Sequence, residues 1–197
     1  MKIIVTRHGQ TEWDRLGKLQ GQTDNSLNEE GKAQAEETGK QIADEKIDLI
    51  ISSPLIRARE TAEIINKRFN VPIIEDDRIK ERNYGQCEGI TLEERLELSQ
   101  RNPIVNNVWN YNENIDFNGI ERMHDFCKRV YGFLNDITET YNGKNILIVA
   151  HGGVFFPISC YFNRRPLTDI VDRHSVKGLQ NCEVARFEIK KDLDHDL

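Results

Sequence analysis

The sequence predicts an α/β protein, a three-layer α/β/α sandwich around a mostly parallel mixed sheet. Short apolar runs typical of buried strands alternate along the chain with long amphipathic segments typical of helices. Such alternation favours a parallel sheet that is covered by helices on both faces. With 197 residues, of which 38% are hydrophobic and 30% are charged, the chain suits one domain with a core of its own.

The first predicted strand covers residues 2–6, where Ile, Ile and Val stand in a row. A loop with several glycines is expected over 7–27. Asn28 then begins the first helix, because asparagine is a favoured N-cap residue and two glutamates follow it in the first turn. This helix is expected to run to about Lys46.

The apolar run DLIIS predicts a second buried strand over residues 48–52. Pro54 opens the next helix at a position where proline is tolerated, and the apolar face of that helix extends to Phe69. A short strand is predicted over 71–74, and the pattern of residues 91–101 indicates another helix.

The clearest amphipathic helix in the sequence runs from Gly119 to Tyr141, with apolar residues at the helical period. The run NILIVA predicts a third buried strand over 145–150, followed by a short apolar helix over 154–162. Two more strands are expected over 175–179 and 183–189.

We expect a single domain over residues 1–191. The stretch of about 80–118 is predicted to be a cap-like insertion over the site, because its second part is rich in asparagine and irregular. The acidic end of the chain, residues 192–197, is predicted to be a disordered tail.

Charge and composition favour a cytoplasmic protein that binds neither nucleic acid nor membrane. The formal net charge is −6, whereas a nucleic-acid-binding domain needs a basic face. No apolar run approaches the ~18 residues that span a bilayer. The first strand begins at residue 2, which leaves no room for a signal peptide before it. The four cysteines form no CxxC pair, as expected for reduced, buried thiols.

Cationic and titratable side chains follow three of the predicted strands. Arg7 and His8 come directly after the first strand, and His151 comes directly after the strand NILIVA. Arg57 lies in the first turns of the helix that follows DLIIS. Because sites in open α/β sheets form beyond the carboxyl ends of the strands, we expect these four side chains to converge. Together they match the charge and shape of a phosphoryl dianion.

This combination of residues predicts phosphoryl transfer. A neutral imidazole is a competent nucleophile near pH 7, and we assign that role to His8. Its other ring nitrogen is expected to donate to a backbone carbonyl, and Gly9 leaves room for that close approach. Arg7, Arg57 and His151 are expected to stabilise the phosphoryl oxygens as charge moves.

Glu81 is the candidate general acid and base. The negative charge of a bound phosphate favours the protonated form of a neighbouring carboxyl, which can then supply a proton to the leaving alkoxide. The same group can next activate water. A metal site made by the two histidines and Glu81 is an alternative, but the spacing lacks an HExxH pattern and Arg7 would repel a cation. We therefore expect no metal and no cofactor.

Four segments in order resemble the histidine phosphatase superfamily, also called phosphoglycerate mutase-like: TRHGQTEW, SSPLIRARETA, ERNYGQCEG and VAHGG. The resemblance extends from residue 3 to about residue 187. It implies the phosphoglycerate mutase-like fold, with His8 as nucleophile, Glu81 as proton donor and no metal or organic cofactor. The residues predicted to complete the phosphate pocket or line the substrate side are Arg7, Gly9, Asp14, Gln20, Gly21, Arg57, Tyr84, His151 and Gly152.

Two departures from the family pattern bear on function. Relatives usually carry asparagine at the position of Asp14, where a carboxylate repels a dianion unless it is protonated, turned away or paired with a cation. Glycolytic mutases carry a lysine where this chain has Leu92, and an arginine pair where it has Asn110-Tyr111. The second phosphoglycerate charge would lose its partners here, so a hydrolase fits better than a mutase.

The resulting hypothesis is a phosphomonoesterase that acts on a small soluble phosphate ester through a phosphohistidine intermediate. Sugar phosphates, phosphoglycerate-like acids and a nucleotide-loop phosphate such as α-ribazole phosphate are all open as substrates. A phosphoglycerate mutase is the first alternative. A non-catalytic or protein-directed regulatory module on the same fold is the second. The sequence makes no prediction of oligomeric state.

Overall fold

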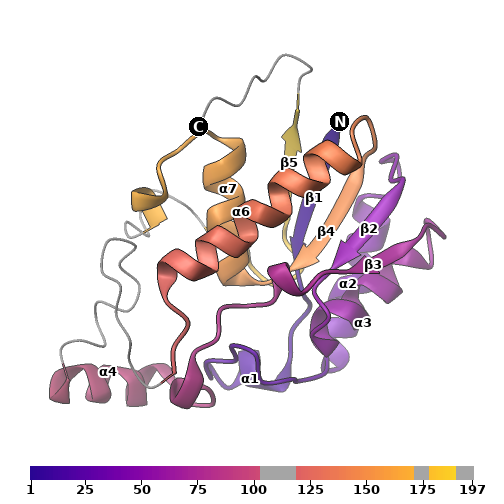
Figure 1. Ribbon diagram of the computed structural model, residues 1–197. Helices are drawn as coiled ribbons and strands as arrows, with labels where there is room; N and C mark the ends of the chain where they lie inside the picture. Colours follow the sequence, from indigo (N-terminus) through magenta and orange to yellow (C-terminus); the bar gives the residue numbers. More distant parts are fainter. Residues whose placement is uncertain (103–118, 171–177, 190–197) are drawn as a thin grey trace.

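The computed structural model describes residues 1–102, 119–170 and 178–189 of the chain. A five-stranded sheet lies at its centre, with strand order β3-β2-β4-β1-β5 (Figure 1). The first four strands are parallel, and β5 pairs antiparallel with β1. The strands are β1 (Lys2–Arg7), β2 (Leu49–Ser52), β3 (Ile73–Glu75), β4 (Ile146–Ala150) and β5 (Val184–Glu188).

Helices cover both faces of this sheet, which confirms the predicted three-layer α/β/α class. The α-helices are α1 (Glu12–Arg15), α2 (Glu29–Gln41), α3 (Ile56–Asn66), α4 (Leu92–Arg101), α6 (Met123–Thr140) and α7 (Gly152–Phe162). Helices α2 and α3 lie on one side of the sheet, and α6 and α7 lie on the other (Figure 1). Helix α4 extends away from the layered body (Figure 1).

Two apolar clusters hold the layers together, and alternation along the strands assigns residues to them. In β1, Ile3 and Val5 pack with α6 and α7, whereas Ile4 packs with α3 on the opposite face. All three side chains are buried. Because β1 and β4 carry apolar residues on both faces, they read as the continuous hydrophobic runs from which the sequence predicts buried strands.

Three predicted helices are shorter in the structure. The helix expected from Pro54, with an apolar face to Phe69, covers Ile56–Asn66. The helix expected to reach Lys46 ends at Gln41, because the buried Ile42 turns into the core and the amide of the next residue bonds only three residues back. The helix expected from Gly119 begins at Met123. Glu121 instead donates its backbone N–H to the carbonyl of Asn83, so this segment pairs with a loop before the helix starts.

The structure describes only some of the residues for which the C-terminal strands, the cap and the tail are predicted. Strand β5 confirms the strand predicted over 183–189. Of the strand predicted over 175–179, only residues 178 and 179 are described, and they lie outside any strand. Residues 103–118 of the predicted cap and the predicted tail at 192–197 lie outside the described residues. In the part of the chain that the structure covers, no helix combines the length and apolar character needed to cross a bilayer.

The register of the sheet positions the candidate site. Strand β4 lies between β1 and β2, and Arg7 is paired with Ala150 at the carboxyl ends of β1 and β4. His8 and His151 therefore leave the sheet side by side. Ser52 is the last residue of β2 and pairs with Val149, so the residues after β2 reach the same edge.

Candidate active site

The two histidines predicted to converge lie in contact. Their ring centroids are 5.2 Å apart, with the ring planes tilted by 57°. His8 is 3% exposed and His151 is 1% exposed. The backbone holds His8 in place, because its N–H donates to the carbonyl of Ala150 and its carbonyl accepts from the side-chain amide of Asn181.

The partners of His8 define which ring nitrogen carries its proton. Nδ1 lies 2.7 Å from the carbonyl oxygen of Gly9, which can only accept a hydrogen bond. Nε2 lies 3.2 Å from Nε of Arg57, which can only donate. The proton is therefore on Nδ1, and Nε2 presents its lone pair to the site. This is the arrangement that a nucleophilic imidazole needs.

Electrostatics keep both imidazoles neutral. Burial, reinforced by the charges of Arg57 and Arg7, lowers the pKa of His8 from 6.5 to about 3. Burial and the same two guanidinium groups also hold the pKa of His151 well below its usual value. A protonated imidazole has no lone pair on either nitrogen, so this environment keeps the lone pair on Nε2 of His8 available at neutral pH.

Arg57 is fully buried at the start of α3, and two backbone carbonyls fix its guanidinium. Nη2 donates to the carbonyl of Gly21 at 2.7 Å, and Nη1 donates to the carbonyl of Thr23 at 3.0 Å. The loop of residues 20–23 thereby aims the remaining Nε–H at His8. A charge fixed in this way costs no reorganisation when a phosphoryl group arrives.

Asp14, whose carboxylate would repel a phosphoryl dianion if it were unpaired, forms an ion pair with Arg7. Nη2 of Arg7 lies 2.5 Å from Oδ1 of Asp14. Oδ2 of Asp14 accepts the backbone N–H of Thr11, whose hydroxyl accepts the N–H of Asp14 in return. Burial alone would raise the pKa of Asp14, but the charge of Arg7 and the hydrogen bond from the backbone N–H of Thr11 lower it. Asp14 is thus ionised and paired with a cation.

One donor of Arg7 has no hydrogen-bond partner among the described residues. Its Nε is buried, and no hydrogen bond from it is found among the residues that the structure covers. The same is true of Nδ1 of His151. Buried polar atoms without partners are rare in native proteins, and at a functional site they indicate a ligand that completes them.

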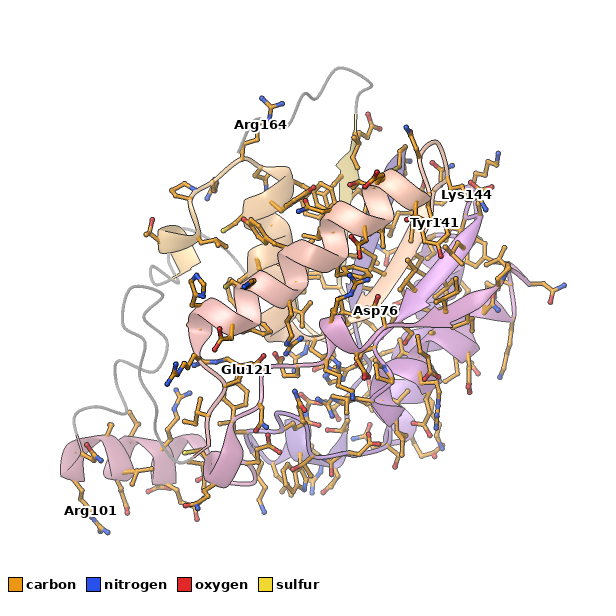
Figure 2. The ribbon with its side chains drawn as sticks, viewed as in Figure 1. Asp76, Arg101, Glu121, Tyr141, Lys144 and Arg164 are labelled. Carbon is orange, nitrogen blue, oxygen red and sulfur yellow. The ribbon has the colours of Figure 1, made fainter. Side chains whose placement is uncertain are left out.

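Glu81 is held by two backbone amides at the edge of this site. Its Oε1 accepts the N–H of Arg82 at 2.8 Å, and its Oε2 accepts the N–H of Gly153 at 2.9 Å. The carbonyl of Glu81 accepts from Arg129 of α6. The same guanidinium pairs with Glu121, which lies just before α6 (Figure 2). Glu81 is therefore fixed next to the first turn of α7.

The comparison with protein families agrees with this geometry. The model of the histidine phosphatase superfamily (branch 1) matches residues 3–194. The chain belongs to the histidine phosphatase superfamily. The predicted family is confirmed, and with it the phosphoglycerate mutase-like fold and, at the level of the family, a histidine-type phosphatase.

Individual relatives support the same assignment. The uncharacterized phosphatase PhoE of Bacillus subtilis (strain 168) is 41% identical over 150 residues, which cover 76% of this chain and 71% of the relative. Phosphoserine phosphatase 1 of Hydrogenobacter thermophilus is 33% identical over 152 residues, which cover 77% of this chain and 71% of the relative. Among solved structures, Bacillus stearothermophilus YhfR matches with a TM-score of 0.84 at 29% identity, over 96% of this chain and 92% of that one.

The other predicted substrate residues of this histidine phosphatase have varied surroundings. Gly152 lies against the Arg7 side chain at the start of α7. A Cβ on Gly9 would lie 2.4 Å from the carbonyl oxygen of Gly31 in α2. The absence of a side chain at Gly9 therefore allows the backbone of α2 to approach closely. Gln20 is nearly buried and accepts from the hydroxyl of Thr11.

Tyr84 is held by apolar packing, and Gly21 lies against Glu88, a residue that the sequence did not indicate. Tyr84 is 4% exposed and packs with Cys87 and Ile120. Gly21 has a φ of +56°, and a Cβ on it would lie 2.0 Å from Oε1 of Glu88. The backbone conformation and the close carboxylate thus favour glycine at this position.

Glu88 joins the two loops that carry the site. Its Oε1 accepts the backbone N–H groups of Gln22 and Tyr84, at 2.9 Å and 3.0 Å. Its Oε2 accepts the N–H of Thr23 at 2.8 Å. Because Thr23 in turn supplies a carbonyl to Arg57, Glu88 indirectly fixes the guanidinium beside His8. No sequence pattern links Glu88 to these backbone amides, so its contacts could be found only in the structure.

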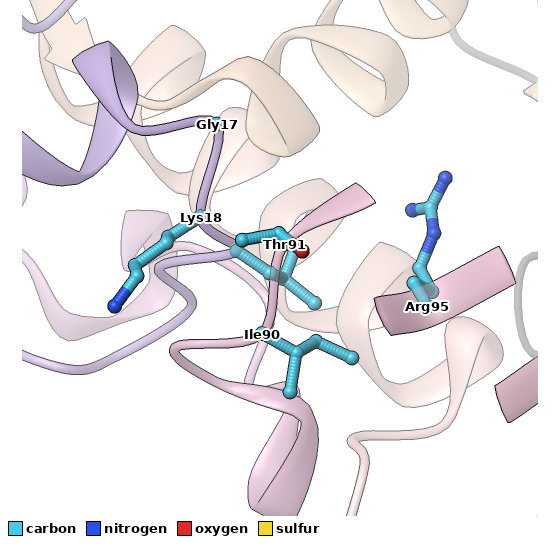
Figure 3. A pocket seen from close by; sticks show the side chains of 6 residues that line it. Gly17, Lys18, Ile90, Thr91 and Arg95 are labelled. Carbon is cyan, nitrogen blue, oxygen red and sulfur yellow. The ribbon is translucent and has the colours of Figure 1, made fainter. Parts of the chain in front are cut away.

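A separate pocket of about 160 Å³ lies between the loop after α1 and the start of α4. Lys18 and Arg95 line it, but none of the predicted site residues does. The ammonium group of Lys18 and the guanidinium group of Arg95 point away from one another (Figure 3). The pocket therefore does not concentrate positive charge as the His8 site does.

Replacing Asp14 by asparagine is expected to strengthen phosphate binding by about tenfold, because one negative charge next to Arg7 is removed from a low-dielectric site. The inhibition constant of inorganic phosphate measures this change. Glu12→Gln is the matched control, since Glu12 lies on the same short helix but is exposed and pairs with Arg15. Equal or weaker phosphate inhibition in Asp14→Asn would show that the carboxylate does not oppose the anion.

Gly153→Ala is expected to displace Glu81 while leaving the fold intact. The added Cβ would lie 2.3 Å from Oε1 of Glu81, so the carboxylate must move away from the amide that holds it. We expect kcat/KM for alkyl phosphates to fall at least about tenfold, the low end for a misplaced general acid. Gly132→Ala is the control, because a Cβ at that helical position meets nothing within 4 Å. Similar kcat/KM values for the two variants would contradict the position assigned to Glu81.

Proposed function

We propose that this histidine phosphatase is a phosphomonoesterase that hydrolyses a small phosphorylated metabolite through a phosphohistidine on His8. The observation that carries the proposal is the hydrogen-bonded state of His8. Its Nδ1 donates to the carbonyl of Gly9 and its Nε2 faces Nε of Arg57, so a neutral nitrogen lone pair meets a guanidinium in a buried site. A lone pair in that position supports attack on a phosphoryl dianion that the guanidinium attracts.

In the first step, Nε2 of His8 attacks phosphorus as the bond from phosphorus to the ester oxygen breaks. The leaving alkoxide takes a proton from the carboxylic acid of Glu81. Arg57 and Arg7 balance the three equatorial oxygens with charge and hydrogen bonds, including the Nε–H of Arg7 that has no partner among the described residues. Catalysis here consists mostly of positioning and electrostatic stabilisation.

In the second step, water attacks the phosphorus of phosphohistidine and gives a proton to the carboxylate of Glu81. The bond from Nε2 to phosphorus breaks, inorganic phosphate leaves, and His8 regains its lone pair. Glu81 regains its proton in the same step, so one residue serves as acid and then as base. The fixed position of Glu81 on the amides of Arg82 and Gly153 supports this double role.

The substrate class is proposed from the pair of cations next to His8. Arg57 faces Nε2 of His8 and Arg7 lies against Gly152, next to His151, which together suit one phosphoryl group. A relative at 33% identity is named phosphoserine phosphatase 1. We therefore place phosphoserine in the first panel of substrates, together with sugar phosphates, 3-phosphoglycerate and α-ribazole phosphate. The cytoplasm, where such metabolites occur, is the proposed location.

Phosphate release from this panel tests the function. We expect inorganic phosphate to be released from at least one ester without any bisphosphate primer. Incubation of 3-phosphoglycerate with and without 2,3-bisphosphoglycerate separates hydrolysis from mutase chemistry, since a mutase conserves phosphate and depends on the primer. Conversion of 3-phosphoglycerate to its isomer without phosphate release would replace the proposal by the mutase. Absence of turnover and of an acid-labile phosphoryl adduct would favour a non-catalytic module.

A further inference from the structure

Ser53 is buried directly behind His151. Its Oγ lies 2.8 Å from Nε2 of His151, and the residue is fully buried. Ser53 follows β2, whereas His151 follows β4, so the contact depends on the neighbouring position of these two strands. The chemistry proposed above does not involve this serine.

The contacts of Ser53 restrict where its proton can point. The oxygen accepts the backbone N–H of Leu55 at 3.3 Å. Among the residues that the structure covers, Nε2 of His151 is the one acceptor within hydrogen-bond distance of the hydroxyl. A buried hydroxyl without an acceptor is costly, so its proton belongs on the line to Nε2.

This direction determines the tautomer of His151. A nitrogen that accepts from a hydroxyl has no proton of its own, and a neutral imidazole must then carry its proton on Nδ1. Burial and the nearby guanidinium groups keep His151 neutral. Nδ1 is itself buried and has no partner within the described part of the chain. The Nδ1–H of His151 is therefore available to donate a hydrogen bond to a phosphoryl oxygen.

We propose that Ser53 is a positioning residue that donates to Nε2 of His151 and thereby holds the Nδ1–H of His151 ready for a phosphoryl oxygen. The inference rests on the proposed phosphatase function. His151 then acts as a neutral donor and adds no positive charge next to His8. The opposite tautomer would leave Ser53 without an acceptor and would present a lone pair to the anion.

The chain offers a matched control for this proposal. Ser52 is the neighbouring serine, is equally buried, and donates to the carbonyl of Ser53 at 2.9 Å. Ser52→Ala and Ser53→Ala each remove one buried hydroxyl that hydrogen-bonds to a neighbouring group. Ser52→Ala loses the bond to the carbonyl of Ser53, and Ser53→Ala loses the long bond from the amide of Leu55 together with the bond to His151. Only the second variant removes the partner of His151.

Long-range ¹H–¹⁵N spectra of histidine-labelled protein test the proposal without requiring turnover, with the His151 signals assigned by comparison with His151→Gln. We expect a protonated Nδ1 and an unprotonated Nε2 in wild type and in Ser52→Ala. A mixture of tautomers is expected in Ser53→Ala. In parallel, kcat of Ser53→Ala should fall about tenfold or more relative to Ser52→Ala, because a histidine in the wrong tautomer loses its catalytic hydrogen bond.

The results that overturn the proposal are specific. A protonated Nε2 in wild type reverses the hydrogen bond on which it depends. An Nδ1–H tautomer that is unchanged in Ser53→Ala removes the role of the serine, whatever the activity does. If no variant, wild type included, turns over any phosphate ester, the proposed function fails, while the spectra still decide the tautomer.

Discussion

His8→Asn is expected to abolish turnover, with a loss of kcat/KM of at least about 10⁴-fold, as found when a catalytic nucleophile is removed. In the wild-type protein the carbonyl of Gly9 accepts from Nδ1 of His8, and the side-chain amide of asparagine can still donate to it. It supplies no nitrogen lone pair at the position of Nε2. Phosphate release and a labelled phosphoryl adduct should both be lost.

His124→Gln provides the control for His8→Asn. His124 lies on α6 with 56% of its side chain exposed, so its replacement should leave kcat/KM near that of wild type. Residual activity of His8→Asn within about 100-fold of wild type would mean that another group attacks phosphorus, because such a loss is too small for a missing nucleophile.

Glu81→Gln is expected to slow esters according to their leaving groups. For alkyl phosphates, kcat/KM should fall about 10²- to 10⁴-fold, the usual contribution of a general acid. For nitrophenyl phosphates it should fall far less, because a nitrophenolate leaves without a proton. The comparison uses kcat/KM, which reports the steps up to release of the alcohol and excludes the later attack of water.

Glu75→Gln is the matched control for Glu81→Gln. Glu75 is an exposed glutamate at the end of β3, and its replacement should change neither class of substrate. Equal slowing of alkyl and nitrophenyl esters in Glu81→Gln would remove Glu81 from the acid role and leave it as a residue that only shapes the site.

The convergence of His8 and His151 could be predicted from the sequence, because a recognisable strand leads to each of them. His8 and His151 each follow a run of apolar residues that is buried on both faces, so their strands could be recognised and their ends compared. The register that pairs Arg7 with Ala150 brings the two imidazoles together as expected. The centroid distance of 5.2 Å is short enough for the proposed contact of both rings with one phosphoryl group.

Side-chain contacts between distant segments could not be predicted in the same way. The bond from Ser53 to His151 and the four contacts of Glu88 depend on loop geometry that no periodic pattern encodes. Short helix α1 had a signal, since Thr11 and Asp14 form the T-x-x-D pattern of a capping box. That pattern also explains how a carboxylate at Asp14 is satisfied within the site.

The identity of the phosphorylated nitrogen tests the central claim most directly. Wild-type protein would be incubated with a rapidly reacting aryl phosphate, quenched in base, digested and analysed by ³¹P and ¹⁵N spectroscopy. The hydrogen bond from Nδ1 of His8 to Gly9 leaves Nε2 as the free nucleophile, so we expect an acid-labile adduct on His8 with phosphorus bonded to Nε2. Phosphorus on Nδ1, on another residue, or on no residue while phosphate is still released would contradict the account.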